Sequence, residues 1–260
     1  MIYIEEMRVA CQQTITDARG RQRLKGAWWN VRFSRHVSIY LTALFVRLGV
    51  TANQVTGTML VVGFGSFLCA LPHALALNVA SFGLFLLFHI LDCSDGEVAR
   101  WTKRCSNGGV YLDYAAHVTC NCPLLAAAAL HYALLRNDLF YSLVAFATLM
   151  LALWAYYFKL IVPALAGRQA RPRYSGDDLV PNRTLADSIR RVRFLFLDPI
   201  LPPMLVVILI LLSHHWEKAC VVAAVYGLLT ALFLSAFYFV VGFVKAKRTD
   251  LDAREIPGTV

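Results

Sequence analysis

Long apolar stretches separated by short polar segments run along most of the chain. A helix that crosses a bilayer core of roughly 30 Å needs about 20 mostly apolar residues. That template fits six segments, namely residues 53–72, 77–97, 108–135, 139–164, 195–213 and 219–244. The pattern therefore predicts an all-α polytopic integral membrane protein with six transmembrane helices.

The composition agrees with a bilayer as the solvent. Hydrophobic residues make up 58% of the 260 residues, charged residues make up 16%, and the mean hydropathy is +0.57. This is more apolar surface than one soluble core of that size would hide. We expect a cytosolic N-terminus with a juxtamembrane helix over residues 1–52, a transmembrane domain over 53–245 and a cytosolic tail over 246–260.

The distribution of Lys and Arg predicts the orientation of the chain. The first 52 residues, the turn after the second span, the segment after the fourth span and the tail are basic, whereas the turns after the third and fifth spans hold only Arg136 and Lys218. By the positive-inside rule, both termini and the turns after spans two and four face the cytosol. Residues 1–25 lack the apolar region of a cleavable signal peptide, so we expect the N-terminus to start in the cytosol.

Residues 24–47 predict an amphipathic helix ahead of the first span. Apolar anchors such as Leu24, Trp28 and Ile39 are mixed there with the basic residues Arg32 and Arg35. Two arrangements stay open, a helix lying in the membrane interface and a cytosolic extension of the bundle. The net charge of +9 indicates contact with anionic membrane lipids and no nucleic acid, because no nucleic-acid-binding motif surrounds the basic residues.

The candidate chemistry lies at the end of the second span and the start of the third. Asp92 and Asp95 are three residues apart and share a helix face, as do Asp113 and His117, which are four apart. The short loop between the spans makes them antiparallel neighbours, so both pairs should lie near the cytosolic side. These groups need a counter-charge, which one or two divalent cations, Mg²⁺ or Mn²⁺, would supply. The alternative is that Asp92, Asp95 and Arg100 form an ion-pair cluster that only orders the bundle.

Small and basic residues flank these carboxylates. Gly96 and Gly109 have no Cβ and leave room for backbone or ligand to approach. Arg100 lies one turn beyond Gly96 and can present a fork of donors to a phosphate. The histidines near the predicted outer ends of the spans, away from this cluster, are expected at the interface; they are His131, His214 and His215.

These positions resemble the signature of the CDP-alcohol phosphotransferase family, D-x2-D-G-x2-A-R-x8-G-x3-D-x3-D. The chain matches seven of the eight fixed positions, which are Asp92, Asp95, Gly96, Ala99, Arg100, Gly109 and Asp113, and has His117 in place of the last Asp. The segment TANQVT at 51–56 resembles the family's N-x-x-T entry to the first span. Six spans also agree with the family's architecture.

The resemblance implies an enzyme that moves a phosphatidyl or phospho-alcohol group from a CDP-linked donor, such as CDP-diacylglycerol, to a hydroxyl acceptor. CMP is released, and the reaction would serve phospholipid biosynthesis. The resemblance also implies Mg²⁺ or Mn²⁺ held by Asp92, Asp95 and Asp113, and a homodimer. His117 takes the place of an aspartate that binds metal and is the proposed general base. The implied donor-binding residues are Asn53, Thr56, Gly96, Ala99, Arg100, Ser106 and Gly109.

The imidazole at position 117 leaves three interpretations open. In the first, His117 is a working base and the metal preference is altered, because a nitrogen ligand favours Mn²⁺ or Zn²⁺ over Mg²⁺. Otherwise it marks a subfamily with a different acceptor, or the protein is a degenerate member that acts as a lipid-binding or scaffold protein. A transporter is a further alternative, although the usual internal repeat is not apparent.

The basic segment between the fourth and fifth spans faces the same predicted side as the site. Arg190 and Arg193 would either bind an anionic acceptor, such as a glycerol or inositol phosphate, or lie against lipid phosphates. The sequence does not choose the acceptor.

Overall fold

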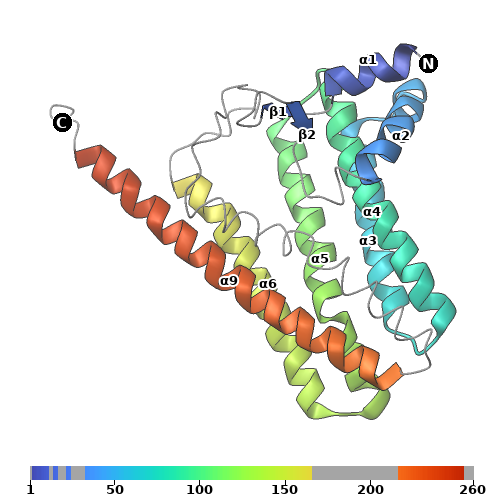
Figure 1. Cartoon of the computed structure of the whole chain (residues 1–260), viewed down its shortest axis with the longest axis vertical. Coiled ribbons are helices and arrows are strands. Elements are labelled where there is room, and N and C mark those ends of the chain that lie inside the picture. Colours follow the sequence, from blue (N-terminus) through green and yellow to red (C-terminus); the bar gives the residue numbers. More distant parts are fainter. Residues whose placement is uncertain (1, 12–13, 17–21, 25–32, 166–215, 255–260) are drawn as a thin grey trace.

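The structure, a computed structural model, describes residues 2–11, 14–16, 22–24, 33–165 and 216–254 (Figure 1). In chain order the elements are α1 (Ile2–Cys11), β1 (Thr14–Thr16), β2 (Gln22–Leu24), α2 (Arg35–Arg47), α3 (Ala52–Ala70), α4 (Leu75–Trp101), α5 (Asn107–Arg136), α6 (Leu139–Leu165) and α9 (Trp216–Arg254). The described part is therefore helical apart from one short antiparallel hairpin, in which Thr14 lies opposite Leu24.

Five of these helices are long and apolar enough to cross a membrane, namely α3, α4, α5, α6 and α9. They confirm five of the six predicted spans as helices, and the span predicted at 195–213 lies outside the described residues. The apolar part of α9 covers Trp216–Val240, and the helix continues to Arg254. The first part of the predicted tail is thus helical.

Polar caps set where two of the spans begin. At the start of α3, Thr51 Oγ1 accepts a hydrogen bond from the amide of Gln54, and Gln54 Oε1 accepts one from the amide of Thr51 at 2.9 Å. At the start of α5, Ser106 Oγ accepts from the amide of Gly109 at 3.0 Å. Asn137, in the left-handed conformation, ends α5.

Helix α3 packs against both α4 and α5, and α5 in turn packs against α6 and α9 (Figure 1). The core between α3, α4 and α5 includes Val55, Met59, Phe88 and Cys120, each at most 1% exposed. Gly63 lies at the closest approach, because a Cβ there would come within 2.5 Å of Cys120 Sγ and 2.7 Å of Phe88 Cδ2. The absence of a side chain lets the three helices meet.

The N-terminal region differs from the single helix predicted over 24–47. Leu24 ends strand β2, and the helical part described is α2, which starts at Arg35. The β-branched run at 14–16 favours an extended backbone, which explains the hairpin. Helix α2 packs against α4, with Ile39 and Ala43 buried together with Met7 of α1. Placement of α2 in the membrane interface stays a prediction.

Candidate active site

The two helices that carry the motif run in opposite directions on either side of a short connection. Helix α4 ends at Trp101, Lys103 adopts a positive φ of 55° in the turn, and α5 begins at Asn107. The connection is on the end of the molecule where α1 and α2 lie (Figure 1). The prediction that these two spans are antiparallel is confirmed.

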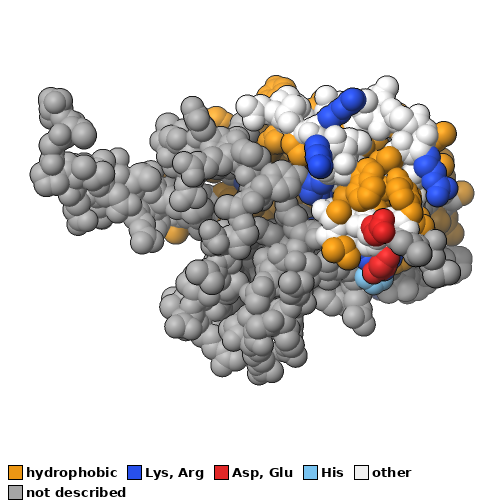
Figure 2. Space-filling view, turned by 90° about the horizontal axis from the view of Figure 1, so that it is seen from above, with side chains coloured by type: hydrophobic (Ala, Val, Ile, Leu, Met, Phe, Trp, Pro, Cys, Tyr) orange, Lys and Arg blue, Asp and Glu red, His pale blue; other side chains and the backbone are white. Residues whose placement is uncertain are grey.

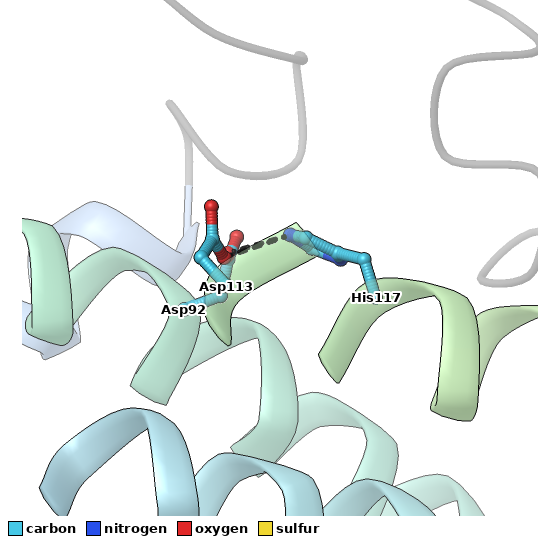
Figure 3. A group of neighbouring side chains, drawn as sticks. All are labelled: Asp92, Asp113 and His117. Carbon is cyan, nitrogen blue, oxygen red and sulfur yellow. Dashed lines mark hydrogen bonds and ion pairs between the residues drawn. The ribbon is translucent and has the colours of Figure 1, made fainter. Parts of the chain in front are cut away.

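Three motif side chains from α4 and α5 come together at this end of the bundle (Figure 3). One ligand atom from each of Asp92, Asp113 and His117 lies within 4.8 Å of the others. His117 Nε2 is 3.0 Å from Asp92 Oδ1 and 3.4 Å from Asp113 Oδ1. The imidazole thus sits between two carboxylates that belong to different helices.

This group fits a divalent cation. Asp113 Oδ1 is buried, and besides the ion-pair contact with His117 at 3.4 Å it has no hydrogen-bond partner among the described residues, so it can accept a further ligand. Carboxylate oxygens suit Mg²⁺ and Mn²⁺, and the imidazole nitrogen shifts the preference toward Mn²⁺. The three side chains remain 20% to 39% exposed, which leaves them open to an incoming ligand.

Asp95 lies apart from this group. Its side chain is 7% exposed, and its Oδ2 is 2.7 Å from the hydroxyl of Thr56 on α3. The structure therefore pairs a predicted metal ligand with a predicted donor-binding residue. The Thr56 hydroxyl is also 3.1 Å from the carbonyl of Ala52, so it bridges α3 and α4.

Three of the predicted donor-binding residues meet where α3 and α5 begin. A Cβ on Gly109 would lie 3.2 Å from Asn53 Oδ1 and 3.3 Å from Ser106 Oγ. The carbonyl and hydroxyl oxygens of Asn53 and Ser106 thus flank a backbone position without a side chain. Ala99, one helix away, accepts a hydrogen bond from the amide of Arg104 at 3.0 Å and so helps to end α4.

Arg100 is held against the N-terminal helix. Its Nε donates to the carbonyl of Cys11, the last residue of α1, at 2.7 Å. A Cβ on Gly96 would be 3.0 Å from Arg100 Nη1, so the room at Gly96 is taken by this guanidinium. Burial raises the pKa of the Cys11 thiol to about 11, so the thiol stays neutral and the carbonyl is the partner of the cation.

Sequence reasoning missed Glu97, which lies between motif residues on α4. Glu97 is 2% exposed and accepts hydrogen bonds from Ser38 at 2.9 Å and from Thr42 at 2.8 Å, both on α2. Its position within a predicted span could have indicated a buried partner, because an acidic residue in a membrane is energetically costly unless it is paired.

Lys159 on α6 was also missed. Its Nζ lies 5.5 Å from the ring centre of Tyr114, which follows Asp113 on α5, and 5.3 Å from that of Tyr156. Lys159 is the one charged residue in the predicted span 139–164, and this could have indicated a functional residue. A third helix thus contributes a cation near the carboxylates.

Basic side chains are spread over the described surface at this end of the molecule (Figure 2). Lys103 and Arg104, in the connection between α4 and α5, are exposed. The predicted acceptor-binding residues Arg190 and Arg193, and the histidines at 214 and 215, lie outside the described residues. His131 lies at the end of α5 opposite the motif, as expected, and is 3% exposed; its place at the membrane interface stays a prediction.

Comparison with curated proteins finds no match. A family model described as CDP-alcohol phosphatidyltransferase matches residues 49–176, a region that includes α3, α4, α5 and α6. Members of this family transfer a phospho-alcohol group from a CDP-alcohol and generally depend on a divalent metal. The matched region holds the group of Asp92, Asp113 and His117, and the family model that matches it is the one that the sequence motif indicated.

Proposed function

We propose that the protein moves a phosphatidyl or phospho-alcohol group from a CDP-linked donor, such as CDP-diacylglycerol, to a hydroxyl acceptor in phospholipid biosynthesis. The observation that carries this proposal is the convergence of Asp92, Asp113 and His117 from two antiparallel helices within the family region. The contacts of His117 Nε2 with both Asp92 and Asp113 favour a working site over a degenerate scaffold.

In the proposed reaction the acceptor hydroxyl oxygen attacks the donor phosphorus distal to cytidine. The bond from that phosphorus to the bridging pyrophosphate oxygen breaks, and CMP leaves with the electron pair. The hydroxyl proton passes to a base, for which His117 is the candidate. Asp92 and Asp113, with His117 whenever its Nε2 is not taking the proton, would hold Mg²⁺ or Mn²⁺, and the metal would neutralise pyrophosphate charge. Asp95, the fourth predicted ligand, would act from its contact with Thr56.

Only one nitrogen of His117 can serve this chemistry. Nε2 faces Asp92 and Asp113, while Nδ1 is 3.2 Å from Asn121 Nδ2 on the next turn of α5. The roles of metal ligand and proton acceptor therefore fall on the same atom and exclude each other at any one moment. Both roles need a lone pair on Nε2.

The remaining protein groups would bind and orient the donor. Asn53 and Ser106 present an amide and a hydroxyl beside Gly109, at the start of α3 and α5, and these groups would bind the cytidine part of the donor. Arg100 and Lys159 add positive charge from α4 and α6, which suits a pyrophosphate. Ala99 and Thr56 would shape the same side of the site.

The acceptor, the orientation and the oligomer belong to the proposal as well. We infer that both termini and the site face the cytosol, which the exposed Lys103 and Arg104 support. Membrane lipids would contact the basic surface. Arg190 and Arg193 remain the candidates for binding an anionic acceptor, and a homodimer remains a prediction.

The test is CMP release by the purified protein in lipid-detergent micelles. CDP-diacylglycerol, Mg²⁺ or Mn²⁺ and a panel of alcohols and alcohol phosphates are supplied, with Asp113→Asn as the inactive control. Release that needs one acceptor and disappears in the control supports the transferase and identifies the acceptor. Absence of release, with neither donor nor metal bound, refutes it in favour of a scaffold.

The substitution His117→Asp restores the family residue. We expect it to preserve or raise Mg²⁺-dependent CMP release, because a carboxylate oxygen suits Mg²⁺ better than an imidazole does. The ratio of activity with Mn²⁺ to activity with Mg²⁺ should fall. Complete loss of activity in a folded protein contradicts this expectation and indicates that the imidazole serves a different acceptor.

A further inference from the structure

A polar stripe continues along α5 beyond the family motif. Asp113, His117 and Asn121 follow one another at intervals of four residues and so lie on one face of the helix. Asn121 Nδ2 is 3.2 Å from His117 Nδ1 and 3.0 Å from the hydroxyl of Tyr156 on α6. The ring of His117 is therefore contacted from both sides, by carboxylates at Nε2 and by an amide at Nδ1.

The orientation of the Asn121 amide is coupled to the tautomer of His117. When Asn121 Nδ2 donates to Nδ1, the ring proton is on Nε2 and is shared with Asp92, 3.0 Å away. After a half-turn of the amide, Oδ1 accepts a hydrogen bond from Nδ1–H, and the lone pair of Nε2 points to the side of Asp92 and Asp113. The Oδ1 atom is buried without a hydrogen-bond partner among the described residues in the first orientation.

Tyr156 can serve both orientations, because a hydroxyl both accepts and donates. It accepts from Asn121 Nδ2 in the first orientation and would donate to Oδ1 in the second. Tyr156 also supports Lys159, whose Nζ lies 5.3 Å from the centre of the Tyr156 ring. Helix α6 is thereby linked to the imidazole through one hydrogen-bonded amide.

We propose that Asn121, supported by Tyr156, is a positioning residue that sets the His117 tautomer and directs the Nε2 lone pair toward Asp92 and Asp113. The inference rests on the proposed function, in which Nε2 binds a metal or takes the acceptor proton. Groups that bond the remote nitrogen of a ligating histidine typically alter metal affinity or activity by about 10- to 100-fold.

The test is Mn²⁺ binding to the full-length protein in detergent micelles, followed by the electron paramagnetic resonance signal of free Mn²⁺. Asn121→Leu removes the amide at similar volume and should weaken Mn²⁺ binding by about 10- to 100-fold. Asn121→Asp keeps an acceptor for Nδ1–H and should bind Mn²⁺ at least as tightly as wild type. Cys122→Ala is the packing control, since Cys122 is 0% exposed and points to another face of α5.

The double variant His117→Ala/Asn121→Leu tests whether Asn121 acts through the imidazole or only fills space. His117→Ala alone should weaken Mn²⁺ binding. Adding Asn121→Leu to it should cause no further loss, because Asn121 acts on the metal site only through the His117 ring. An equal further loss in that background overturns the proposal, as does wild-type affinity in Asn121→Leu. If Asn121→Leu does not fold, Tyr156→Phe takes its place, with a several-fold loss expected only when His117 is present.

Failure of this inference is distinguishable from failure of the proposed function. Mn²⁺ binding that responds to Asn121→Leu in a protein that neither releases CMP nor binds a CDP-linked donor supports the positioning role and refutes the transferase. If the protein releases CMP and Asn121→Leu does not change its affinity for Mn²⁺, the positioning role is refuted and the transferase is not.

Discussion

At the scale of single residues, the carboxyl group of Glu97 joins the motif helix to the N-terminal region. Its partners Ser38 and Thr42 are each 0% exposed, so their hydroxyls have no access to water. Because Glu97 follows Gly96 and lies three residues before Arg100 on α4, a movement of α2 would also displace these motif residues.

Replacing Glu97 with Leu should loosen α2 from α4. The change leaves the hydroxyls of Ser38 and Thr42 buried without that acceptor, at a cost of about 1–3 kcal/mol for each group. The expected result is faster hydrogen exchange of the α2 amides and a lower Tm in detergent. Glu97→Gln keeps one acceptor oxygen and should lose less; wild-type protection of α2 in Glu97→Leu contradicts the proposed anchor.

The sequence predicts some site contacts and misses others for identifiable reasons. Asp113 and His117 are local neighbours on one helix, and the short connection brings Asp92 opposite them, so periodicity alone brings the three together. Asp95 is turned onto Thr56, because α3 occupies the neighbouring face of α4, and no local pattern states where a third helix packs. The bond from Arg100 to Cys11 joins residues 89 positions apart and leaves no periodic signal.

At the scale of the elements, the close approach of α3 to α4 and α5 depends on Gly63. A Cβ at this position would meet Cys120 Sγ at 2.5 Å and Phe88 Cδ2 at 2.7 Å, closer than packed atoms come. Gly57 on the same helix has nothing within 4 Å of the corresponding position. The two glycines therefore form a matched pair.

Gly63→Ala should destabilise the protein by about 1–3 kcal/mol, because extra volume in a packed core displaces its neighbours. Gly57→Ala should be neutral or stabilising by up to about 1 kcal/mol, since alanine favours a helix. Thermal unfolding in one detergent measures both. Cys120→Ala should recover part of the loss in Gly63→Ala, and equal effects at the two glycines would mean that α3 does not pack as described.

Elements were predictable in proportion to their length and apolar character. The helices α3 to α6 and α9 follow directly from apolar runs long enough to cross a bilayer. Helix α1 has only 10 residues with mixed polarity, and it is stabilised by packing of Met7 and Cys11 against α2 and α4, which no local pattern encodes. The hairpin next to it is shorter still.

At the scale of the whole molecule, a second polar contact closes the end opposite the motif. The buried imidazole of His131 contacts the carbonyl of Leu71 through Nδ1 at 2.6 Å and accepts from Trp216 Nε1 at 2.9 Å. Arg136 also pairs with Glu217. These contacts join the turn after α3, the end of α5 and the start of α9. Helix α5 therefore links α3 and α4 to α6 and α9.

Trp216→Phe should weaken this junction without affecting catalysis. The change leaves His131 Nε2 buried without a donor, at a cost of about 1–3 kcal/mol, and should lower Tm and the protection of the first amides of α9. CMP release per folded molecule should be unchanged, because Asp92 lies about 25 Å along α4 from the junction. Trp154→Phe, at a site 57% exposed, is the control; equal losses in both variants would contradict the role of the junction.

The bond between Arg100 and the carbonyl of Cys11 also bears on how the protein is handled. Helix α1 is 10 residues long, so its first residue is only about 15 Å along the helix from the carbonyl that holds the motif arginine. An affinity tag or fluorescent fusion at the N-terminus would therefore be attached one short helix away from Arg100. The far end of α9 lies across the molecule from α1 (Figure 1), which makes the C-terminal side the better point of attachment.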